Sequence, residues 1–219
     1  MAWLILAVIL YGFSHTVRKN LFHPDPPRPF LLYVHGAVFF DWVLFFIFQS
    51  ALVRTRNVRL HRLIGWFGVA LGCLIPVLGV AIAIVMGRFH LEVLRDTTSQ
   101  TDLFIPLWDI ACFTVTFALA ILWRKKPELH RRLLLIASCA LTAAAWGRVP
   151  EQLLNPNYFY SGVDLLILFG VVRDWIVSRR IHTVYLYALP AFILGQIGVM
   201  YIYLHQPPLW IKIARALLG

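Results

Sequence analysis

Residues 31–62 read LLYVHGAVFFDWVLFFIFQSALVRTRNVRLHR. The first part of this stretch, 31–53, is apolar apart from a few polar side chains. About 20 such residues cross the roughly 30 Å hydrocarbon layer of a bilayer as a helix. A hinge rich in arginine follows and ends at His61 and Arg62. The stretch therefore predicts one transmembrane helix, a basic turn and the start of a second helix.

The composition extends this prediction to the whole chain. Of the 219 residues, 60% are hydrophobic and 14% are charged, and the mean hydropathy is +0.76. A water-soluble domain of this size exposes too much surface to carry such a composition. No polar segment is long enough to fold separately, so we expect residues 1–219 to form a single all-α integral membrane domain.

The net charge of +10 would suggest a nucleic-acid partner if the protein were soluble. Here the cations gather at the ends of apolar runs, where they set topology and contact lipid phosphates. We therefore expect membrane lipids as partners and no nucleic acid.

Apolar runs of helical length predict a bundle of seven transmembrane helices. The first is short, and six spans remain if it lies in the membrane interface instead. The segment 23–29, HPDPPRP, cannot be helical because of its prolines, and the tail 206–219 is expected to lie along the interface. The predicted helices are 2–17, 31–53, 61–86, 103–123, 129–148, 161–177 and 182–204.

The basic residues also predict the orientation of the chain. The hinges after the second, fourth and sixth predicted helices are basic, whereas most loop acids lie on the other side. Because loops rich in Lys and Arg stay in the cytoplasm, we expect a plasma-membrane protein with a cytoplasmic N-terminus.

Three successive helical hairpins share a pattern. The first helix of each carries one aspartate (Asp41, Asp109 and Asp164), and the second begins close to a histidine beside or near arginine (His61, His130 and His182). The pattern is typical of transporter families built from internal repeats. We therefore expect a repeat of two-helix units.

The polar residues inside the spans predict a ligand-binding site. His35, Trp42 and Gln49 are spaced by seven residues and share one helix face, which must look into the bundle because lipid cannot solvate polar groups. Asp41, Asp109 and Asp164 are predicted in the outer half of the bilayer, with Arg148 as their counter-ion. The pattern indicates an outward-facing polar cavity that binds a small solute, proton or cofactor for transport or sensing.

A structural role for the same residues is the competing interpretation. His35 and Gln49 would then hydrogen-bond neighbouring helices, and Asp109 would form an ion pair with Arg148. The protein would in that case serve in structure or assembly.

The basic hinges predict a second site. Helix N-termini that carry histidine and arginine bind anions, so a lipid headgroup or another anion is expected at His61, Arg62, His130, Arg131, Arg132 and His182. The three cysteines lack CxxC spacing and no HExxH pattern occurs, so neither a metal site nor a catalytic residue is predicted.

A redox role is the remaining alternative. Haem b needs two imidazoles that face each other from neighbouring helices at matching depth. His15 and His35 are the pair that meets this condition in the predicted topology. The hypothesis is a membrane protein that holds haem b and exchanges electrons with quinone.

Two motifs carry a resemblance to a known group. The first comprises His35, Gly36, Trp42, Gln49, Leu52, Val53, His61, Arg62 and Gly65; the second comprises Pro127, Glu128, His130, Arg131, Arg132 and Leu133. Both resemble a widespread group of uncharacterised bacterial inner-membrane proteins with seven helices. The resemblance covers about half of the chain, implies a bacterial inner membrane and supplies no reaction. The histidine-arginine helix starts are also faintly similar to cytochrome b561-like haem proteins.

Overall fold

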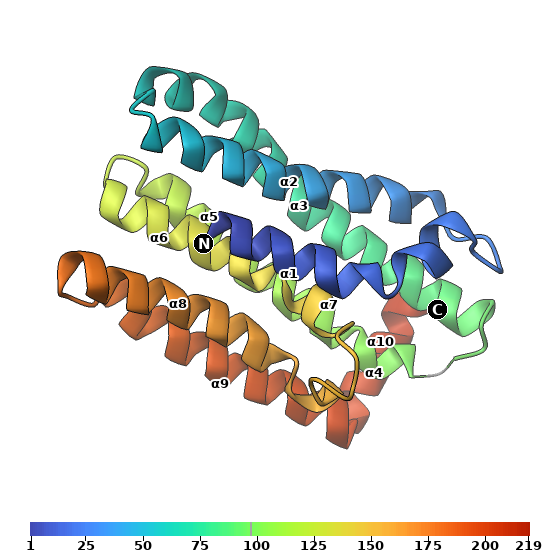
Figure 1. Ribbon diagram of the computed structural model, residues 1–219. Helices are drawn as coiled ribbons and strands as arrows, with labels where there is room; N and C mark the ends of the chain where they lie inside the picture. Colours follow the sequence, from blue (N-terminus) through green and yellow to red (C-terminus); the bar gives the residue numbers. More distant parts are fainter. Residues whose placement is uncertain (97) are drawn as a thin grey trace.

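The computed structural model describes residues 1–96 and 98–219, without the side chain of Ser99, and every regular element in these residues is a helix (Figure 1). The all-α prediction is thus confirmed. The elements in chain order are α1 (Ala2–Ser14), a π-helix (Arg18–Phe22), α2 (Phe30–Arg54), α3 (Val58–Glu92), α4 (Ser99–Asp102), α5 (Phe104–Leu122), α6 (Pro127–Ala140), α7 (Ala143–Trp146), a 3-10 turn (Pro156–Tyr158), α8 (Tyr160–Ser178), α9 (Thr183–His205) and α10 (Pro208–Leu218).

The long helices form three antiparallel hairpins, α2/α3, α5/α6 and α8/α9, whose short connections lie at the same end of the bundle (Figure 1). We call this the hairpin end. The basic hinges predicted from the sequence are these connections. The predicted helix 129–148 is divided into α6 and α7, and α3 is longer than predicted at both ends.

Four helical segments are long and apolar enough to cross a membrane: α2, α3, Gln100–Leu122 and α9. The chain is therefore a multi-pass membrane protein by the length and composition of its helices. The predicted count of seven spans is not confirmed. The helix α8 has 19 residues, as α5 does, but it is not among these four segments. It carries three charged residues, Asp164, Arg173 and Asp174.

Helix α1 is too short to span a bilayer, because its 13 residues extend over about 20 Å. It packs against α2, α6 and α7 within the bundle, and its first residue lies inside the bundle and not at either end (Figure 1). Ile5 is fully buried. Gly12 lies so close to the backbone of Ala145 in α7 that an added Cβ would overlap the Ala145 carbonyl.

Helix α3 is in close contact with α2 and α5 at three of its glycines. A Cβ at Gly68 would meet the Phe45 ring, one at Gly72 the Phe117 ring, and one at Gly79 the Ile110 side chain. The absence of a side chain at these three positions lets the neighbouring helices approach α3 closely. The close approach does not extend to Gly65, which faces open space.

An aromatic cluster joins α2 and α5 at the centre of the bundle. The Trp42 ring lies 5.2 Å from the Phe113 ring and 5.6 Å from the Phe117 ring, measured between centroids. The Trp42 indole N–H donates to Ser138 of α6 at 3.2 Å. Trp42 thus connects three helices through one side chain.

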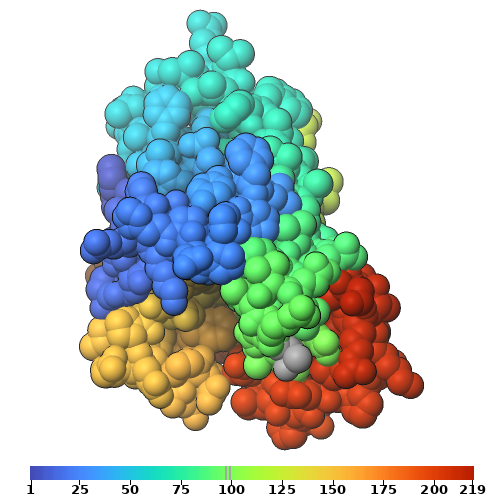
Figure 2. Space-filling model, turned by 90° about the vertical axis from the view of Figure 1, so that its right-hand side faces the viewer, coloured from blue at the N-terminus to red at the C-terminus, as the bar shows by residue number. Residues whose placement is uncertain are grey.

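The C-terminal helix α10 crosses the end of the bundle opposite the hairpin end (Figure 1). Trp210, Ala214 and Leu218 are buried there, and the Trp210 indole N–H donates to the Gln100 carbonyl at 3.1 Å. Figure 2 shows this end, with the C-terminal segment beside the start of the α5 region. Its position relative to a membrane interface stays a prediction.

Candidate functional site

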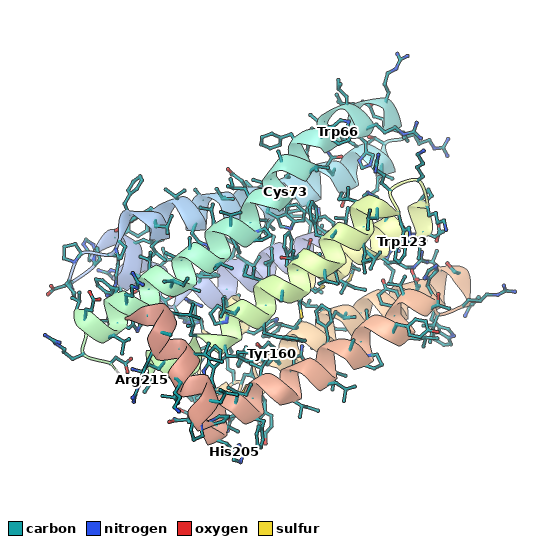
Figure 3. The ribbon with its side chains drawn as sticks, turned by 180° about the vertical axis from the view of Figure 1, so that it is seen from behind. Trp66, Cys73, Trp123, Tyr160, His205 and Arg215 are labelled. Atoms are coloured by element: carbon teal, nitrogen blue, oxygen red, sulfur yellow. The ribbon has the colours of Figure 1, made fainter. Side chains whose placement is uncertain are left out.

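Two of the predicted aspartates lie where α5, α8 and α9 meet. The Tyr160 hydroxyl of α8 donates to Asp109 of α5 at 3.0 Å, and the Gln196 amide of α9 donates to Asp164 of α8 at 3.1 Å. Tyr160 and Asp164 are four residues apart and therefore share one face of α8. We call Asp109, Tyr160, Asp164 and Gln196 the carboxylate cluster. The label of Tyr160 marks its place in Figure 3.

Close packing of α5 on α9 holds this cluster in place. The Trp108 indole occupies the space beside Gly195 that a Cβ would fill. Trp108 precedes Asp109, and Gly195 precedes Gln196. The glycine thereby lets the two helices approach at the depth where the carboxylates are bonded.

The third aspartate is not part of the cluster. Asp41 is exposed near the middle of α2, and the structure does not bring it to Asp109 or Asp164. Arg148 donates to the Ala144 carbonyl at 2.5 Å, and its guanidinium lies 4.6 Å from the centroid of the Phe13 ring. The Asp109–Arg148 ion pair that the sequence suggested is therefore not formed.

The heptad face of α2 points inward only in part. Trp42 and Gln49 are buried as expected, and both amide atoms of Gln49 lack a hydrogen-bond partner in the described part of the chain. His35 is partly buried and packs on Phe39, with ring centroids 4.0 Å apart. Its Nδ1 is likewise buried without a partner.

His15 and His35, the predicted haem ligands, are not brought face to face. The His15 ring packs on Tyr11, with centroids 5.0 Å apart, whereas His35 packs on Phe39. Haem b binding at this pair stays a prediction from the sequence alone.

A polar hollow lies at the end opposite the hairpin end. Its volume is about 370 Å³, and Arg215 donates from Nε to the Gln100 side chain at 3.3 Å. Figure 3 labels His205 and Arg215 at this place. Sequence reasoning missed this hollow, although polar residues at 98–101 and cations in the tail are both signals for it. The lining residues are Thr98, Gln100, Thr101, Gln206, Ile211 and Arg215.

The hairpin end contains a buried ion pair that sequence reasoning also missed. Arg132 of α6 donates from Nε to Asp174 of α8 at 2.5 Å, and both side chains are almost fully buried. Arg132 also donates to Glu128 at 2.6 Å, and the exposed Arg131 to the same carboxylate at 2.7 Å. Arg132 lies on the buried face of α6, and a buried arginine needs an acidic partner. This requirement is the sequence signal that could have predicted the ion pair.

The predicted anion-binding histidines differ in their surroundings. The rings of His61 and His130 lie 6.5 Å apart, and His130 Nδ1 lies 2.9 Å from the Ala120 carbonyl oxygen. The Nδ1 atom of His61 is buried and has no hydrogen-bond partner among the residues that the structure describes.

His182 instead caps α9, because its Nδ1 accepts a hydrogen bond from the Val184 backbone N–H. Arg62 is exposed. Anion binding at these residues stays a prediction.

Glu128 and His182, both at the hairpin end, have shifted pKa values. The hydrogen bond from Arg132 lowers the pKa of Glu128. Partial burial, followed by the charge of Arg132, lowers the pKa of His182. Both groups therefore take up protons more readily in the unfolded state, and acid destabilises this end.

We expect a pH-dependent loosening of the hairpin end. The contribution of His182 is present above the unfolded pKa of about 6.5 and decreases as the pH falls below it; that of Glu128 is lost below about 4.3. The protection factors of amide hydrogen exchange at 124–132 and 174–184, corrected for the pH dependence of the intrinsic exchange rate, should thus fall as the pH is lowered from 7 to 4. Protection at the α10 end, measured in the same samples, provides the control, and an equal fall at both ends would contradict the assignment of this effect to Glu128 and His182.

Comparison with known proteins gives no relative on which to base a function. No family model, no curated protein and no solved structure matches the chain. Among the residues that the structure describes, no group of three or more His, Cys, Asp or Glu side chains could hold a metal ion. The function is therefore inferred from the site geometry.

Proposed function

We propose that this chain is a multi-pass protein of the bacterial inner membrane that binds a proton at the carboxylate cluster and a small polar solute nearby, for transport or sensing. The hydrogen-bonded contact of Asp109 with Tyr160, beside the Asp164–Gln196 pair, is the observation that carries this proposal. The cytoplasmic N-terminus expected from the basic hinges belongs to the same proposal.

The membrane setting makes these carboxylates candidates for proton binding. An ionised aspartate at membrane depth costs several kcal/mol unless it is paired or reaches water, and such residues mark ion and proton pathways. No Lys or Arg forms an ion pair with Asp109 or Asp164 in the described chain; their partners are a hydroxyl and an amide. Such neutral partners accommodate either protonation state of the carboxyl group with a small rearrangement.

The polar hollow supplies a place for the solute. Asp109 follows Gln100 by nine residues and Gln206 follows Gln196 by ten, so each interval corresponds to about 14 Å along a helix. The hollow and the cluster thus share α9 and the α4–α5 segment. Arg215 and the surrounding amides and hydroxyls favour a polar or anionic solute.

We expect the variant Asp109→Asn to lose a titrating carboxylic acid. Infrared spectra of the purified protein, recorded over a pH series, should contain a carbonyl band of a protonated acid in weakly polar surroundings. The band should weaken in Asp109→Asn and shift in Asp164→Asn. In the matched control Glu151→Gln, at an exposed loop position, it should persist. A band unaffected by both aspartate substitutions would rule out the cluster as the proton site.

A further inference from the structure

An apolar groove runs along the outside of the bundle between α3 and α5. Its volume is about 450 Å³. Val69, Cys73 and Pro76 line it from α3, and Thr114, Ala118 and Leu122 line it from α5. We call it the α3/α5 groove. The Phe117 ring fills the space that a side chain at Gly72 would occupy, and both residues belong to the lining of the groove.

The groove has the length of one acyl chain in one leaflet. From Thr114 to Leu122 it extends over eight residues of α5, or about 12 Å. One leaflet contributes about half of the 30 Å hydrocarbon thickness. The groove thus matches the depth of a single leaflet.

The end of the groove nearest the hairpin end is aromatic and basic. Trp66 of α3 and Trp123 after α5 are both exposed, and Figure 3 shows them beyond Cys73 toward that end. The Arg124 guanidinium lies 5.7 Å from the centroid of the Trp66 ring and donates to the Ile121 carbonyl at 3.2 Å. Arg124 therefore bridges the two walls of the groove at its mouth.

Two further cations lie near this mouth in the sequence. Arg62 precedes Trp66 by about one turn of α3, and Lys125 follows Arg124 directly. Tryptophan is enriched at the membrane interface, so this level corresponds to lipid headgroups. None of the described residues that line the groove is acidic.

We propose that the α3/α5 groove binds an anionic phospholipid of the leaflet at the hairpin end. One acyl chain lies against Gly72, Cys73 and Ala118, and the phosphate is held by Arg124 with Arg62. Charge complementarity selects an anionic lipid over a zwitterionic one, since cations near the surface attract anionic headgroups. The inference concerns a surface between α3 and α5, whereas the carboxylate cluster lies between α5, α8 and α9, and it is independent of the proposed function.

Cys73 provides a reporter of groove occupancy, because it is exposed whereas Cys139 is buried and Cys112 is only partly exposed. In nanodiscs, the rate at which an apolar maleimide modifies Cys73 should fall when phosphatidylglycerol replaces phosphatidylcholine. Peptide mapping by mass spectrometry identifies the modified cysteine. Equal rates in the two lipids would overturn the proposal.

The number of phosphatidylglycerol molecules retained after detergent purification provides a second measurement. We expect Arg124→Gln to lower the affinity for this lipid about fivefold, from the attraction that one surface cation contributes. Ala118→Leu, which fills the groove, should lower retention of both lipids. The matched control is Arg179→Gln at another exposed cation of the hairpin end, which should retain lipid as the unchanged protein does.

If something other than an anionic lipid occupies the α3/α5 groove, we expect different results. Disulfide cross-linking of Cys73 between two chains, with no dependence on lipid charge, would assign the groove to a second copy and overturn the lipid proposal. So would equal lipid retention in Arg124→Gln and Arg179→Gln. Circular dichroism of each variant confirms that the helices are intact before these comparisons are made.

Discussion

Substitution of Asp174 by alanine is expected to destabilise the bundle by about 3–5 kcal/mol, the usual cost of leaving one member of a buried ion pair without its partner. Arg132 is 4% exposed and would lose its bond to the Asp174 carboxylate while keeping only the half-exposed Glu128. Thermal unfolding in detergent, followed by helix content, measures the effect.

The double variant Arg132→Met with Asp174→Leu separates the charge effect from loss of packing. Replacing both members of a buried pair with apolar residues is often neutral, so this variant should regain most of the lost stability. Arg131→Ala, at the exposed arginine that shares Glu128, should change stability by less than about 1 kcal/mol. If the single variant Asp174→Ala is as stable as Arg131→Ala, the buried pair of Arg132 and Asp174 does not contribute the expected stability.

Substitution of Gly12 by alanine is expected to displace α1 from the bundle or to cost about 1–3 kcal/mol of stability, as overpacking in a close-packed interior does. The added methyl group would overlap the backbone carbonyl of Ala145, and backbone atoms cannot rotate away as a side chain can. Limited proteolysis near residues 15–29, together with thermal unfolding, measures the displacement.

Gly36→Ala is the matched control. Gly36 also lies inside an apolar helix, but an added Cβ there has no atom within 4 Å. The substitution should leave stability unchanged or raise it by up to about 1 kcal/mol, because alanine is the better helix former. If the two variants behave alike, α1 does not pack against α7 as the structure shows.

The sequence predicted the helices well because their physical signal is local. The run 31–53 became α2 with nearly the predicted ends, and the prolines of 23–29 excluded a helix as expected. The division of 129–148 into α6 and α7 was not predicted, since Ala140–Ala143 contains neither proline nor glycine.

Side-chain partners were predicted less well because they depend on which helices become neighbours. The heptad face of α2 correctly placed Trp42 and Gln49 in the interior. Arg148 was nevertheless assigned to Asp109, whereas Tyr160 holds that carboxylate and Arg148 packs over Phe13. The polar hollow combines 98–101 with the C-terminal helix, more than 100 residues away. Each segment is polar or basic by itself, but no local pattern indicates that the two meet.

By itself, the sequence determined that this is an all-helical, multi-pass membrane protein with basic hinges, because apolar length and charge distribution decide how a chain partitions into a bilayer. Only the tertiary structure decided that Asp109 bonds to Tyr160, that Arg132 bonds to Asp174 and that α3 and α5 leave a groove between them. These contacts depend on how far each helix is rotated and how deep it lies when it packs against its neighbours. Glycines such as Gly72 and Gly195 fix both quantities, because an aromatic side chain of the neighbouring helix fills the space beside each of them.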